Sequence, residues 1–191
     1  HGFRYVEVTG YPAKISKENF IGEVVNDDIK LIGSFECSQP MVNQILKNAF
    51  RGIRGNYKGM PIDCPQRNER QPWLGDRTMG SLGESFIFEN VHLYSKWMND
   101  IREAQREDGC IPDVAPPFWN YYTDNVTWPA AFVFAGDMIY TQFGDLLPVK
   151  RNYRAMIKWL KHIKEEYMTE DHIITCDKYG DWCVPPESPE L

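Results

Sequence analysis

Several features that mark large classes of protein are missing from this chain of 191 residues. No stretch approaches the roughly 18 consecutive apolar residues that a membrane-spanning helix needs. The longest apolar patch, residues 128–135, is interrupted by Pro129. The chain also opens with His-Gly-Phe-Arg instead of a basic segment and an apolar leader. We therefore expect no membrane span, and because the first residue is not Met we expect the natural start to lie upstream.

Positive charge is scarce as well. Lys and Arg number 21 against 27 Asp and Glu, which gives a net charge of −6. Proteins that bind nucleic acid usually carry a dense basic stripe or patch, and the sequence has no such cluster. It therefore predicts no nucleic-acid partner.

The cysteines are few, odd in number and without a Cys-x-x-Cys pair: Cys37, Cys64, Cys110, Cys176 and Cys183. This pattern argues against a zinc site or a dense disulfide framework, and it leaves the redox compartment open. The chain also lacks Gly-x-Ser-x-Gly, His-Glu-x-x-His, a phosphate-binding loop and a dinucleotide-binding fingerprint. We expect no redox cofactor and no phosphate site. No set of metal ligands is visible in the sequence, and whether calcium is bound stays open.

Aromatic residues, by contrast, are plentiful, with 6 Trp, 10 Tyr and 10 Phe. Four tryptophans lie beside carboxylates or turn residues instead of within apolar runs: Trp73, Trp119, Trp128 and Trp182. Flat aromatic faces next to polar groups suit sugar rings, which present apolar C–H faces and hydroxyl edges. The alternative is that these side chains simply fill the core, and for the set as a whole the two interpretations are about equal.

The hydrophobic pattern changes after the first 36 residues. Segments rich in β-branched and aromatic residues, which predict strands, are 3–8, 20–25 and 29–35. Apolar residues at helical spacing predict helices over 42–53, 78–88, 91–107, 126–140 and 149–167. A few strands followed only by helices indicate a mainly α chain, in which a helical domain follows the end of a β-domain that lies mostly upstream.

Residues 61–76 contain the densest set of chemically capable side chains. They are three acids, two arginines and a tryptophan, set among prolines that stiffen the backbone: Asp63, Arg67, Glu69, Arg70, Trp73 and Asp76. Arginines can keep some carboxylates ionised, whereas a carboxyl group in an apolar pocket has a raised pKa and can donate a proton. Glycoside hydrolysis needs carboxylates divided in this way. A salt-bridged loop that only pins two domains together explains the residue types equally well.

The run Asp63-Cys-Pro-Gln-Arg-Asn-Glu69-Arg, followed by Trp73-x-Gly-Asp76, resembles the signature of the family 78 glycoside hydrolases, the bacterial α-L-rhamnosidases. Further segments that resemble this family are 1–8, 108–116, 124–129, 143–145 and 179–182. The resemblance implies that residues 1–36 are the end of a β-sandwich domain with linker strands. Residues 37–191 would then be the N-terminal part of an (α/α)6 catalytic barrel.

The resemblance also implies roles for individual residues. Glu69 would be the general acid of an inverting hydrolase, and we expect its pKa to be raised. Asp63 and Asp76 would hold sugar hydroxyls, while Trp73 and Trp182 would wall the rhamnose ring. Weaker candidates for hydroxyl contacts or support are Arg67, Asp124 and Asp181. Asn68 stands where many relatives carry an acid.

The general base of the family is a Glu from later in the barrel, and no residue before Leu191 matches it. We therefore expect these residues to be an interior piece of a longer enzyme, which alone would neither fold stably nor hydrolyse rhamnosides.

The resulting prediction is hydrolysis of terminal non-reducing α-L-rhamnose from an oligosaccharide or glycoside, without a cofactor. The other expected partners are the remaining domains of the same chain, and the substrate class suggests a periplasmic or extracellular location. Two alternatives stay open. One is another (α/α)6-barrel glycosidase, such as a fucosidase or a glucoamylase-like enzyme, and the other is a sugar-binding domain without activity.

Overall fold

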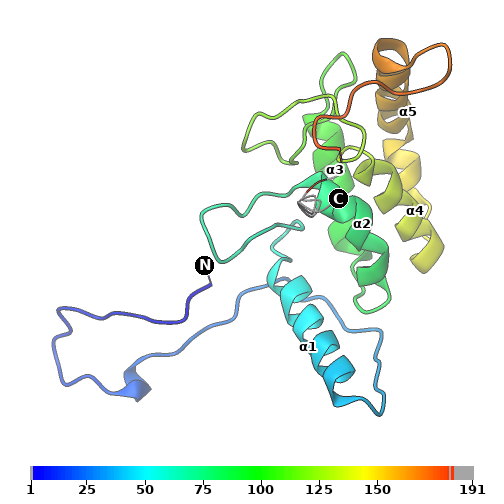
Figure 1. The fold of residues 1–191 in the computed structure, drawn as a ribbon. Coiled ribbons are helices and arrows are strands. Elements are labelled where there is room, and N and C mark those ends of the chain that lie inside the picture. Colours follow the sequence, from blue (N-terminus) through cyan, green and yellow to red (C-terminus); the bar gives the residue numbers. More distant parts are fainter. Residues whose placement is uncertain (1, 181, 183–191) are drawn as a thin grey trace, which may run out of the picture.

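The computed structural model describes residues 2–180 and 182, and this part of the chain is mainly helical (Figure 1). A short 3-10 helix, η1 (Lys17–Asn19), precedes the α-helices. These are α1 (Pro40–Gly55), α2 (Leu74–Ser85), α3 (Val91–Ala104), α4 (Ala131–Phe143) and α5 (Leu147–Tyr167). None of the helices in the described ranges has the length and apolar character that crossing a membrane requires.

Residues 2–36 form an extended arm, drawn in blue in Figure 1. None of the three predicted strands is found in it; the only pairing there is the isolated bridge between Leu31 and Phe88. The alternating pattern is present, but a strand also needs a neighbour that shares its backbone hydrogen bonds. Within the described residues the arm contacts the turn after α2, where the Ile32 N–H donates to the Ile87 carbonyl at 2.8 Å, and the start of the α1–α2 connection, where the Asp27 N–H donates to the Tyr57 carbonyl at 3.0 Å.

All of the predicted helices are confirmed, with shifted ends. α2 begins four residues earlier than predicted and ends at Ser85, and α3 ends at Ala104. α4 begins at Ala131 instead of residue 126. The Asn125 side chain accepts a hydrogen bond from the Trp128 N–H at 2.8 Å and so caps a separate turn before the helix. The turn chemistry of Asn125 thus belongs to that turn and not to the helix itself.

Helices α2 to α5 share one hydrophobic core. α2 packs against α4, and α3 and α5 pack against α4 and against each other. The largest side chains of this core include Trp97, Phe132 and Trp159. Trp128 lies directly on Gly75, where an added Cβ atom would stand 2.3 Å from the indole ring. The absence of a side chain at Gly75 therefore allows α2 to approach the segment before α4.

Helix α1 stands apart from this core, as Figure 1 shows. It has no buried residue, and its predicted apolar stripe is largely exposed, with Ile45 at 60%. Its C-terminal half makes apolar contacts, where Phe50 and Ile53 pack on the small cluster of Tyr57, Phe88 and Leu93. The helical spacing of these apolar residues was predicted correctly, but no segment of the described chain packs over most of the stripe.

A buried polar network connects α2 with the α1–α2 connection and with α3. Arg77 donates to Asp63 at 2.8 Å and to Glu84 at 2.5 Å. The other oxygen of Glu84 accepts from the hydroxyls of Tyr57 at 2.6 Å and Tyr94 at 2.7 Å. Arg77, Glu84 and both tyrosines are buried. Both terminal nitrogens of the buried Arg77 guanidinium are thus paired with a carboxyl group, and such pairing offsets the cost of burying the charges.

We expect Arg77→Met to lower the free energy of unfolding by about 3–5 kcal/mol, because it leaves Glu84 buried without its charged partner and removes the contact with Asp63. Arg51→Met, which removes an exposed arginine of α1, should change it by less than about 0.5 kcal/mol. Urea unfolding measures both. Equal effects of the two substitutions would show that the network has no such role.

The contact between Gly75 and Trp128 gives a second test. Gly75→Ala should destabilise the protein by about 1–3 kcal/mol, because the methyl group has to displace a buried indole. Gly83→Ala, in the same helix but with open space around the added Cβ atom, should stabilise it by up to about 1 kcal/mol. Thermal unfolding of the two variants should therefore shift in opposite directions. A shift in the same direction would contradict the packing described here.

Candidate active site

The connection between α1 and α2 carries most of the predicted site residues. Residues 63 and 71 of this connection are joined, since the Asp63 N–H donates to the Gln71 carbonyl at 2.9 Å. Its end is fixed to the connection after α3, since the Leu74 N–H donates to the Asp113 carbonyl at 2.9 Å. The segment between these points is therefore a closed loop, and it carries Glu69.

Glu69 is half-buried and accepts hydrogen bonds on both carboxylate oxygens. Arg67 donates to Oε2, with Nη2 at 2.6 Å, and the Trp73 indole N–H donates to Oε1 at 2.9 Å. Burial alone would raise the pKa of Glu69, but hydrogen bonds from Arg67, Cys64 and Trp73, together with the Arg67 charge, lower it below its usual value. The predicted raised pKa of Glu69 is therefore wrong for this arrangement, because the neighbouring donors favour the ionised form.

Asp63 shows the opposite behaviour. Burial raises the pKa of Asp63 to about 7, and a hydrogen bond with Asp76 adds to the shift, while the Arg77 charge opposes it. Asp63 and Asp76, which the sequence predicted to act together, are thus neighbours. The residue types predicted that one carboxyl group would have a raised pKa while another stays ionised, and the structure has such a pair. The group with the raised pKa is Asp63, however, and the ionised group is Glu69.

The wall beside Glu69 is aromatic. Trp73 stacks on Tyr121 with ring centroids 6.0 Å apart, and it meets Trp119 edge to face, also at 6.0 Å. Tyr179 contacts Trp73 at 6.4 Å and Trp182 at 5.6 Å, so it lies between the two tryptophans that were predicted to wall the sugar. Offset and edge-to-face pairs of this kind hold the rings in fixed orientations.

The four tryptophans divide between the two interpretations of the sequence. Trp128 is 8% exposed and belongs to the hydrophobic core. Trp119 and Trp182 are 37% and 66% exposed, and Trp73 is half-buried. Core filling therefore accounts for Trp128, whereas the other three present ring surface that a ligand can cover.

Asp113 is a site residue that sequence reasoning missed. It is fully buried and accepts hydrogen bonds from Thr123 at 2.9 Å, from Asn125 at 2.7 Å and from the Tyr179 hydroxyl at 2.8 Å. The carboxylate thereby orients Tyr179, which contacts Trp73. An acid within an apolar run, Ile-Pro-Asp-Val-Ala, was the available signal. Its partners lie too far along the chain to be identified from spacing.

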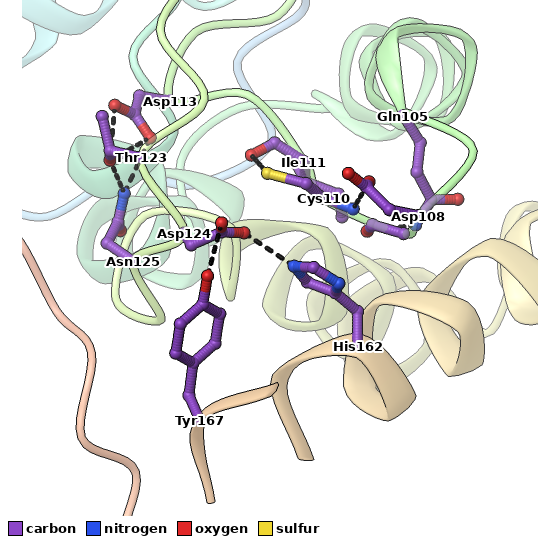
Figure 2. Close-up of polar contacts among 11 residues, drawn as sticks. Gln105, Asp108, Cys110, Ile111, Asp113, Thr123, Asp124, Asn125, His162 and Tyr167 are labelled. Atoms are coloured by element: carbon purple, nitrogen blue, oxygen red, sulfur yellow. Dashed lines mark hydrogen bonds and ion pairs between the residues drawn. The ribbon is translucent and has the colours of Figure 1, made fainter. Parts of the chain in front are cut away.

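The remaining predicted residues are placed differently. Arg67 is bound to Glu69, as described above, and Asn68 is exposed beside it. Both oxygens of Asp124 bind residues at the C-terminal end of α5: His162 Nε2 lies 2.7 Å from Oδ1, and the Tyr167 hydroxyl donates to Oδ2 at 2.8 Å (Figure 2). Asp181 lies outside the described residues. Within them, the one set of three side chains close enough to hold a metal ion is Cys110, Asp124 and His162.

Comparison with known proteins gives a consistent result. Residues 30–190 match the family model described as the bacterial alpha-L-rhamnosidase 6 hairpin glycosidase domain. An alpha-L-rhamnosidase of Streptomyces avermitilis is 34% identical over all of this chain, and one of Formosa agariphila is 34% identical over 98% of it. The chain spans 18% and 20% of these two relatives, about a fifth of their length.

Two solved structures agree with this assignment. An alpha-L-rhamnosidase from Dictyoglumus thermophilum superposes with a TM-score of 0.86 at 35% identity, over 93% of this chain and 20% of that one. The Streptomyces avermitilis alpha-L-rhamnosidase complexed with L-rhamnose gives a TM-score of 0.85 at 31% identity, over 95% of this chain and 18% of that one. Sequence, family model and fold therefore place the chain in the bacterial α-L-rhamnosidase family, within its 6-hairpin glycosidase domain.

Proposed function

We propose that the protein hydrolyses terminal α-L-rhamnose from glycans or glycosides, with Glu69 as the proton donor. The observation that carries the proposal is the position of Glu69, whose carboxylate is held against Trp73 in an aromatic-walled site. The likeness to named rhamnosidases along the whole chain supports the choice of sugar.

In this proposal the aromatic wall receives the apolar face of the sugar and the acids receive its hydroxyls. Trp73 and Trp182 contact the ring and its methyl group. Asp63 keeps its proton to about pH 7 and hydrogen-bonds with Asp76, so it can donate a hydrogen bond to a sugar hydroxyl while other carboxyl oxygens of the pair accept one. The Arg77 guanidinium keeps Asp63 in place while it does so.

Glu69 must take up a proton before it can act as an acid. Its partner Arg67 has a side chain that is 65% exposed and can therefore move away when the substrate enters. With the glycosidic oxygen in place of the guanidinium, burial raises the pKa of Glu69, and the carboxyl group donates its proton to the leaving oxygen. In an inverting reaction a general base about 6.5–9.5 Å away activates water on the opposite face. We place that base outside residues 1–191.

We further propose that residues 37–191 form the N-terminal part of an (α/α)6 barrel, reached from a β-sandwich domain through residues 1–36. The uncovered apolar side chains on α1, α4 and α5 support this arrangement, because further helices of a barrel would cover them. Examples are Ile45, Phe134, Tyr140, Tyr153 and Leu160, which are 46–60% exposed.

The acid role predicts that Glu69→Gln lowers turnover about 10²–10⁴-fold on natural rhamnosides. The loss should be smaller on aryl rhamnosides with a good leaving group, because their departure needs less protonation. Glu107→Gln, which changes an exposed acid, serves as the control. Equal losses on both substrate types would assign Glu69 a structural role.

The full-length wild type distinguishes the rival functions. Binding of rhamnose without turnover would favour a sugar-binding domain without activity, and a preference for fucosides would favour another (α/α)6-barrel glycosidase.

The ion pair with Arg67 predicts a shift in the pH profile. Because Arg67 lowers the pKa of Glu69, Arg67→Met should raise it and move the alkaline limb of kcat/KM to higher pH. Arg51→Met should leave that limb where it is. An alkaline limb that stays in place or moves to lower pH in Arg67→Met would contradict the control of Glu69 by Arg67.

The raised pKa of Asp63 predicts a pH-dependent stability. Between its ordinary pKa of 3.8 and about 7, native Asp63 keeps a proton that the unfolded chain has released. The free energy of unfolding should therefore fall as pH rises through this window, by at most about 1.4 kcal/mol per pH unit. In Asp63→Asn the free energy of unfolding should not show the decrease that is due to Asp63. Asp137→Asn, on the exposed face of α4, should show the same decrease as the wild type. Urea unfolding at several pH values tests this, and parallel curves for wild type and Asp63→Asn would contradict it.

A further inference from the structure

Cys110, Asp124 and His162 converge between the α3–α4 connection and α5 (Figure 2). Cys110 and Asp124 lie on the connection between α3 and α4, and His162 lies on α5. One ligand atom from each side chain lies within 4.8 Å of the other two. The three are far apart in the sequence and form no recognisable spacing, so the cysteine pattern predicted no metal site.

We propose that these three side chains bind a zinc ion. A thiolate sulfur, an imidazole nitrogen and a carboxylate oxygen are all ligands that Zn²⁺ takes in proteins. The sulfur and the imidazole disfavour Ca²⁺ and Mg²⁺, which prefer oxygen ligands throughout. One thiolate and one carboxylate also balance the charge of the divalent ion, so the occupied site is neutral and compatible with its burial.

The geometry needs only side-chain adjustments. Tetrahedral zinc with bonds of about 2.0–2.3 Å has ligand atoms about 3.3–3.8 Å apart. His162 and Asp124, now 2.7 Å apart, must separate slightly, and the Cys110 sulfur must move inward. Cys110 releases its thiol proton to solvent. His162 Nε2 gives up the proton that Asp124 Oδ1 accepts in the absence of the ion. His162 then binds through Nε2 with its remaining proton on Nδ1, and water completes the coordination. The Asp124 side chain, 26% exposed, leaves an entry path.

The surroundings hold two of the three ligands in position. The Tyr167 hydroxyl donates to Asp124 Oδ2 at 2.8 Å, which leaves Oδ1 facing His162. The Asp108 carboxylate accepts the Cys110 backbone N–H at 2.9 Å (Figure 2). Outer contacts of this type orient metal ligands and strengthen binding. Because the ligands come from the connection after α3 and from α5, the ion would connect these two segments.

The test uses the full-length protein without an affinity tag, stripped of metal with a chelator and titrated with Co²⁺. We expect one Co²⁺ per chain, with a near-ultraviolet charge-transfer band from a single thiolate, and we expect Zn²⁺ to displace it. Cys110→Ser and His162→Gln should weaken binding at least 100-fold, and Tyr167→Phe about tenfold. Cys37→Ser removes a cysteine on another segment and should bind as the wild type does.

A titration without a thiolate band, or a band that survives in Cys110→Ser, would overturn the proposal. Should the Cys110→Ser variant not fold, X-ray absorption of zinc bound to the wild type decides the question instead. One sulfur at about 2.3 Å with nitrogen and oxygen at about 2.0–2.1 Å supports the site. Coordination by oxygen and nitrogen alone overturns it.

Discussion

The ion pairs of Arg77 are the constraint on which the rest of the site depends. The guanidinium lies between Asp63 on the loop and Glu84 on its own helix, and two buried tyrosines satisfy the far oxygen of Glu84. Such an arrangement is stable only when every charge and hydroxyl has a partner. One end of the loop is therefore fixed relative to α2. The other end is fixed by the backbone pairing of Leu74 with Asp113.

Between these two fixed ends, the site separates its carboxyl groups electrostatically. Asp63 lies in the buried part, next to Asp76, and retains a proton near neutral pH. Glu69 lies further along the loop, where the exposed Arg67 keeps it ionised. The difference follows from the position of each group along one short loop. It also makes the protonation of Glu69 depend on an exposed partner and not on a side chain of the core.

The sequence predicted the helices well, because apolar residues at helical spacing reflect the packing of α2 to α5 on one core. It misplaced the start of α4, since Asn125 and Pro129 are typical of a helix start but here belong to a preceding turn. The strands of residues 2–36 were not found, because alternation alone does not provide a hydrogen-bonded neighbour.

The site was predicted in part. The motif located Asp63, Glu69, Trp73 and Asp76 on one loop, and the structure brings them together. The partners that set their pKa values were not predictable, since Arg67 is bound to Glu69 and Arg77 to Asp63 through contacts that depend on the path of the loop. Two charged residues seven apart on α2, Arg77 and Glu84, were the one local signal that this helix buries an ion pair.

The central claim is that the fixed loop offers Glu69 to a rhamnose ring seated on Trp73. A crystal structure of the full-length protein with bound L-rhamnose tests it most directly. We expect the ring on Trp73, its hydroxyls on Asp63 and Asp76, the Arg77 pair with Asp63 intact, and Glu69 released from Arg67 and facing the anomeric oxygen. A sugar bound away from Trp73, or a Glu69 still paired with Arg67 beside the bound sugar, would contradict the account.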